Sequence, residues 1–139
     1  MSENKEDLWP EDLFDSNHVF PIDMINKQSE IFNKRAKNIL LSEVKTSKGI
    51  RNQGGKRSEA LSVSLYISAP SLDNYQFALL RFSHDLLEPY PLVVTDLLQN
   101  RNYTISSAKD MEPVLKEIFS SEKNKQIIGS LMHQSKNQN

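Results

Sequence analysis

The sequence predicts an α+β domain with a long N-terminal amphipathic helix, a small antiparallel sheet of three to four strands and two C-terminal helices. Three observations lead to this prediction: apolar residues at helical spacing in residues 22–46, strict alternation in residues 60–69, and helical periodicity near the C-terminus. A chain of 139 residues fits one such domain. We expect the domain to span residues 20–134, between an acidic arm at residues 1–19 and a frayed polar tail at residues 135–139.

The acidic arm contains the stretch DLWPEDLF, in which Pro10 is suited to the first position of a short helix. Its apolar side chains are the candidate protein-binding residues of the chain: Leu8, Trp9, Leu13 and Phe14. An acidic segment with interspersed aromatics can be disordered until it docks on a partner protein, or it can dock on its own domain. A single tryptophan is seldom left in water, which favours docking on the domain.

Residues 22–46 are predicted to form the long helix. Its apolar stripe consists of Ile25, Phe32, Ala36, Ile39, Leu40 and Val44. Glu30 and Lys34 have a favourable i,i+4 spacing on the polar side. Gly49 lies just beyond the expected end, where glycine commonly terminates a helix. Lys45 and Lys48 would then lie near the negative end of the helix dipole.

Residues 60–69 (ALSVSLYISA) alternate between apolar and polar side chains, which predicts a half-buried strand in an antiparallel sheet. Residues 75–87 fit either a helix with one apolar stripe or a strand that pairs with residues 60–69. We favour the strand because the preceding stretch APSLDN has turn chemistry. A strand at residues 60–69 also needs a neighbour for its backbone hydrogen bonds.

Residues 90–98 and 102–106 supply further short strands on either side of the turn QNRN. Two helical segments follow. Asp110 is the expected N-cap of the first, MEPVLKEIFS, and Ser120 or Ser121 is the expected N-cap of the second, EKNKQIIGSLMH.

Composition excludes several classes of function. The sequence has no cysteine, so disulfide bonds, thiolate catalysis and zinc–sulfur sites are ruled out. No apolar run is long enough to span a membrane, and the first residues lack the basic and apolar regions of a signal peptide. We therefore expect a cytoplasmic protein with no cofactor, no bound metal and no membrane partner.

Charge is distributed unevenly along the chain, although the net charge is only −1. Residues 1–23 carry −6, residues 24–57 carry +7 and residues 58–139 carry −2. Two interpretations remain open: the basic block binds an anionic partner, or the acidic arm folds back on it.

The stretch TSKGIRNQGGKRS at residues 46–58 has the glycines of a phosphate-binding loop but not its spacing. Gly55 stands where that loop needs a lysine, and the predicted helix precedes the stretch when it should follow. The stretch is instead a solvated linker or part of a nucleic-acid contact that includes the polar face of the predicted helix. The residues of this alternative site are Lys34, Lys37, Lys45, Lys48, Arg51, Lys56 and Arg57.

Candidate catalytic groups are few, because the three histidines are isolated in the sequence. His84 and Asp85, with Asp73 and Arg81 nearby, form the one cluster suited to acid–base chemistry, and on a strand His84 and Asp85 would point to opposite faces. We therefore predict a small cytosolic, non-catalytic accessory protein that binds another protein through the arm or the terminal helix. A nucleic-acid-binding accessory protein is the alternative.

Overall fold

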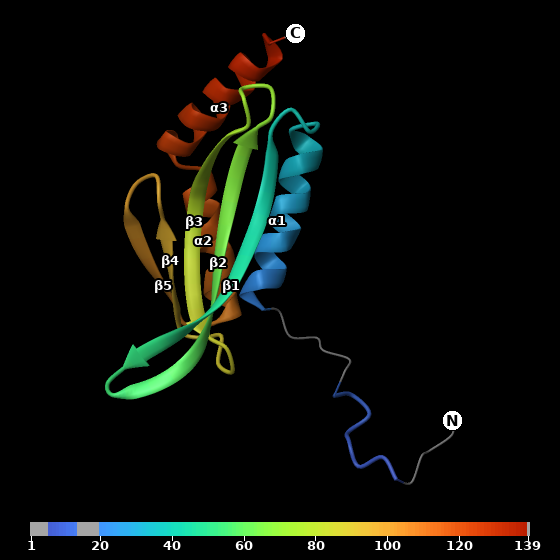
Figure 1. Ribbon diagram of the computed structural model, residues 1–139, viewed down its shortest axis with the longest axis vertical. Coiled ribbons are helices and arrows are strands. Elements are labelled where there is room, and N and C mark those ends of the chain that lie inside the picture. The colour runs from blue at the N-terminus through green and yellow to red at the C-terminus, as the bar shows by residue number, and fades with distance from the viewer. Residues whose placement is uncertain (1–5, 14–19, 139) are drawn as a thin grey trace.

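The computed structural model describes residues 6–13 and 20–138 and shows three helices and five strands (Figure 1). The elements in chain order are α1 (Pro21–Arg35), β1 (Leu41–Gln53), β2 (Lys56–Ala69), β3 (Tyr75–Asp85), β4 (Leu92–Asp96), β5 (Arg101–Ile105), α2 (Ala108–Phe119) and α3 (Glu122–Lys136).

The five strands form one antiparallel sheet in the order β1-β2-β3-β4-β5, so each strand pairs with its neighbour in the sequence. One core includes Val63, Phe82 and Val94 of the sheet together with Ile25 of α1 and Met111 of α2. Because strand side chains alternate, these residues define one face of the sheet, and the helices cover that face. The opposite face, which we call the open face, carries mostly polar side chains.

Helix α1 is shorter than the sequence predicts, because it ends at Arg35 and not near residue 46. Lys37 and Asn38 adopt positive φ angles of 51° and 60°, which turn the chain out of the helix. The residues that follow pair with β2 from Leu41 onward. The backbone hydrogen bonds of the sheet therefore prevail over the apparent helical stripe, in which Leu40 and Val44 have helical spacing by coincidence.

The predicted linker at residues 46–58 is a β-hairpin, and this adds a strand that the sequence analysis missed. The sheet therefore has five strands, where three to four were expected. Gly54 and Gly55 form its two-residue turn with φ angles of +55° and +79°, a conformation that side-chain-bearing residues rarely adopt. In the strand ladder, residues 50–53 and 56–59 pair only with each other, and the ribbon projects past the other strands (Figure 1).

The strand expected at residues 60–69 is present in β2, and residues 75–85 form β3. A β-bulge at Leu79 lets both Leu79 and Leu80 contribute to the core. The two C-terminal helices are also present. Ser121 caps α3 by accepting a hydrogen bond from the backbone of Asn124, whereas α2 begins before Asp110, which lies in its first turn and is not the N-cap.

Candidate functional site

The helical layer contains a groove of about 450 Å³ between α1 and α3. We call it the α1–α3 groove. Its floor is formed by Leu65 and Ile67 of β2 and Leu79 of β3, which are almost fully buried. Its volume lies within the range of about 300–1,000 Å³ that is typical of ligand sites.

The walls of the α1–α3 groove are mainly apolar. Ile31 and Phe32 project from α1, and Ile128 and Met132 project from α3. Ile31 is 38 % exposed, although large aliphatic side chains are more often buried. The sequence predicts that Phe32, Ile128 and Met132 lie on the apolar sides of their helices. It does not predict the space between the two helices.

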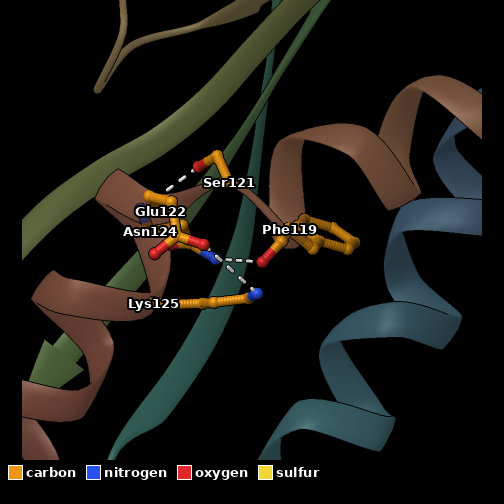
Figure 2. Close-up of polar contacts among 5 residues, drawn as sticks. All are labelled: Phe119, Ser121, Glu122, Asn124 and Lys125. Atoms are coloured by element: carbon orange, nitrogen blue, oxygen red, sulfur yellow. Dashed lines mark hydrogen bonds and ion pairs between the residues drawn. The ribbon is translucent and has the colours of Figure 1, made fainter.

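The corner between α2 and α3, drawn in Figure 2, contributes Phe119, Asn124 and Lys125 to the lining of the groove. Asn124 fixes this corner, because its backbone N–H donates to Ser121 Oγ at 3.1 Å and its side-chain Nδ2 donates to the carbonyl oxygen of Phe119 at 2.8 Å. Figure 2 shows the Phe119 ring and the Lys125 side chain on the side that faces α1. The corner therefore presents one aromatic and one cationic group to the groove.

A polar cluster joins the opposite wall to the sheet. Asn33 Oδ1 accepts from the backbone N–H of Ser42 at 2.7 Å, and Asn33 Nδ2 donates to the Ser42 carbonyl oxygen at 3.3 Å. The Ser42 hydroxyl is also hydrogen-bonded to Ser29. Asn33 thus holds β1 against α1 by pairing with the Ser42 backbone as a neighbouring strand would, and Ser29 and Ser42 both line the groove.

The charged side chains that line the α1–α3 groove are Arg35 and Lys125, so its rim is basic. Lys125 is 3.6 Å from Glu122 Oε1, and this surface ion pair is weak because both side chains are largely exposed. Arg35 forms no ion pair within the described part of the chain. Sequence reasoning missed Arg35, Asn124 and Lys125 as site residues, because no sequence motif marks them and only the packing of the helices brings them to one groove.

The predicted protein-binding residues of the arm are exposed where the structure describes them. Leu8 and Trp9 are 92 % and 70 % exposed, and Leu13 is also exposed. Two local hydrogen bonds shape this segment: the Trp9 backbone N–H donates to Asp7 Oδ1, and that of Leu13 donates to the Pro10 carbonyl. Phe14 lies outside the described residues.

The seven basic residues of the alternative site do not converge. Lys34 and Lys37 are at the end of α1, while the other five lie on the β1–β2 ribbon. Strand alternation places Arg51 on the open face and Arg57 on the opposite one. Lys45 and Lys48 already have partners on the ribbon, the Tyr66 ring at 4.4 Å and Glu59 at 3.1 Å respectively. Neither lysine is near the helix end, where the sequence analysis placed it.

The open face has a hollow of about 500 Å³ beside the projecting ribbon. Arg51 and Arg81 line it together with Asp85 and Glu88, so its charges are mixed. Burial raises the pKa of Tyr90, which also lines the hollow. Mixed charge gives this hollow no clear preference for an anionic ligand.

The one candidate acid–base cluster is separated by the sheet. His84 is buried on the helical side, where its Nδ1 contacts the Asp85 carbonyl oxygen at 2.9 Å. The Asp85 carboxylate instead accepts from the backbone N–H of Leu87. The two side chains therefore lie on opposite faces, as expected for a strand. Over residues 6–13 and 20–138, no group of three or more histidine or acidic side chains is placed to hold a metal ion.

Within the described ranges, no helix is long and apolar enough to cross a membrane. Comparison of the chain with protein-family models, with curated proteins and with solved structures found no significant match.

Proposed function

We propose that this chain is a small non-catalytic accessory protein that binds a segment of another protein in the α1–α3 groove. The observation that carries the proposal is the groove itself, with an apolar floor, half-exposed apolar walls and a basic rim. The ionisable side chains that line it are Arg35 and Lys125, which suit charge recognition better than proton transfer. The proposal places the protein in the cytoplasm, a reducing compartment in which a chain without cysteine is at no disadvantage.

The expected partner segment is short and acidic and has large apolar anchors. Its anchors would fill the space between Phe32 and Ile128, and its carboxylates would approach Arg35 and Lys125. Buried apolar anchors supply most of the affinity in such interfaces, while charges at the rim mainly set specificity and the rate of association.

Selection of peptides from a random displayed library on the immobilised full chain tests this proposal. We expect enrichment of acidic peptides with large apolar residues, and loss of their binding to Ile31→Glu, which places a carboxylate on the groove wall. Ile50→Glu is the matched control, because Ile50 is exposed on the projecting ribbon and away from the groove. Equal binding to both variants, or selection of basic peptides, would contradict the proposal.

A second candidate function is nucleic-acid binding by the projecting ribbon, as the sequence analysis anticipated. The observation that favours it is the position of Lys56 and Arg57 next to the turn of a two-stranded ribbon that extends past the sheet. Two-stranded ribbons fit the major groove of DNA, and each phosphate that they neutralise steepens the dependence of affinity on salt.

A further inference from the structure

We infer that residues 6–13 of the acidic arm dock in the α1–α3 groove and compete there with the external partner segment. This inference rests on the proposed function of the groove. The arm is then a second occupant of the same groove. When it is docked, it lowers the apparent affinity of the groove for the external segment. In the structure the arm lies apart from the domain, so the structure represents the open form (Figure 1).

The arm has the chemistry that the groove is expected to select. Leu8 is 92 % exposed and Trp9 is 70 % exposed, so both offer large apolar side chains to a binding site. Moving them from water into an apolar site is favourable in proportion to the area that is buried. An indole N–H also needs an acceptor when it is buried, and Ser29 and Ser42, whose hydroxyl oxygens can each accept a hydrogen bond, line the groove.

Charge complementarity distinguishes the arm from an arbitrary apolar segment. The charged residues within residues 6–13 are all acidic: Glu6, Asp7, Glu11 and Asp12. The charged residues that line the groove are both basic, Arg35 and Lys125. Docking therefore brings opposite charges together at the rim of the groove, where they favour this segment over a basic or neutral one and speed its association.

The arm is long enough to reach the groove. Phe32 lies about 17 Å along α1 from Pro21, at a rise of 1.5 Å per residue. The chain from Trp9 to Pro21 can span at most about 40 Å when extended, so the reach exceeds the distance by a wide margin. A short tether of this kind gives an effective concentration of about 1 mM. An intrinsic dissociation constant of about 0.1 mM would then keep the arm docked about ten times more often than free.

Tryptophan fluorescence of the full chain tests docking directly, because Trp9 is the only tryptophan. We expect blue-shifted emission that is protected from a soluble quencher, and loss of both properties in Ile31→Glu and in Lys125→Glu. Lys125 is a surface residue, so this second variant should leave the fold intact. Ile50→Glu is the control and should retain the shift. Emission and quenching typical of a fully solvated indole in the unmodified chain would overturn the inference.

Protein concentration separates docking within one chain from exchange between two copies. Docking within the chain predicts that the emission maximum stays constant on dilution. A maximum that moves toward the solvated value on dilution would show that the arm of a second copy fills the groove, and this would overturn the inference as stated.

Competition tests the regulatory consequence. The probe is a labelled synthetic peptide with the sequence of residues 6–13, and its binding is followed by fluorescence anisotropy. We expect binding about tenfold tighter to a full chain that carries Leu8→Ser and Trp9→Ser than to the unmodified chain, because its own arm no longer competes. Equal affinity for the two proteins, or no binding to either, would overturn the inference.

The two proposals fail in different ways. If Trp9 is solvated but library peptides still bind the unmodified chain and not Ile31→Glu, the arm inference fails and the proposed function stands. If Trp9 is docked and the residue 6–13 peptide binds the Leu8→Ser, Trp9→Ser protein but no library peptide does, the groove is an internal docking site and the proposed function fails.

Discussion

The two halves of the β1–β2 ribbon share one hydrogen-bond ladder but lie in different surroundings. The inner half, residues 41–49 and 60–69, lies between α1 and β3 and contains Ile67 at 1 % exposure. The outer half, residues 50–53 and 56–59, pairs only with itself in the strand ladder and contains Ile50 at 56 % exposure. Backbone hydrogen bonds are therefore sufficient to define the local geometry of the two strands. The free energy of folding depends instead on the apolar surface that the strands bury.

Replacing a buried isoleucine of the inner half should have the largest effect. Ile67→Ala is expected to lower the free energy of unfolding by about 2–5 kcal/mol, because it removes buried methyl groups and leaves a cavity. Urea denaturation measures this loss. The matched change in the outer half, Ile50→Ala, should alter stability by at most about 0.5 kcal/mol. Similar losses in the two variants would show that the outer half is packed as tightly as the inner one.

Removing the side chain that holds β1 to α1 should have the next largest effect. Asn33→Ala deletes both hydrogen bonds to the Ser42 backbone and should cost about 1–3 kcal/mol. Thermal unfolding measures the loss, and Asn52→Ala on the exposed outer half is the control. A variant as stable as the unmodified protein would mean that α1 packing alone holds β1 in place.

A glycine substitution in the hairpin turn tests the outer half by itself. Gly55→Ala forces a side chain to φ +79° and should destabilise the ribbon by about 1–2 kcal/mol. Nothing lies within 4 Å of the added methyl group, so the cost is one of backbone strain. Hydrogen exchange should become faster in residues 49–59 while the core strands stay protected. Gly49→Ala, at a position without positive φ, should leave exchange unchanged.

Charge reversal at the ribbon tip should have the smallest effect on stability. Lys56→Glu with Arg57→Glu removes two exposed bases, and the melting temperature should not change measurably. The same variant separates the two candidate functions. If the ribbon binds duplex DNA, the logarithm of the affinity of the unmodified protein falls with the logarithm of salt concentration, with a slope of about −0.9 per phosphate neutralised, and the variant binds weakly. Undetectable DNA and RNA binding at low salt would exclude this second function.

Sequence reasoning succeeded where one surface of an element is uniformly apolar. Residues 60–69 alternate without interruption because β2 is a central strand with one face on the core. It failed for β1, an edge strand whose core-side residues include Ser42, Val44 and Thr46. Only one of these three side chains is aliphatic, so β1 shows no alternation of apolar and polar residues. Val44 was therefore assigned to the preceding helix.

The α1–α3 groove was predictable only in its parts. Phe32 belongs to the predicted stripe of α1, and Ile128 and Met132 to that of α3. Periodicity identifies the apolar side of each helix, but the gap between two helices depends on where each one crosses the sheet. Arg35 and Lys125 become a pair only through that crossing, so no spacing in the sequence indicated them.

Because β1 lies at the edge of the sheet, its basic residues affect aggregation as well as binding. An exposed edge strand offers unpaired backbone groups to any other strand and is a template for aggregation. Along the 13 residues of β1, Lys45, Lys48 and Arg51 recur at every third position. A second copy that approached in register would bring like charges together along the new seam. Repulsion between these cations therefore opposes edge-to-edge pairing of two copies and keeps the protein soluble. This role does not depend on whether the ribbon binds a partner.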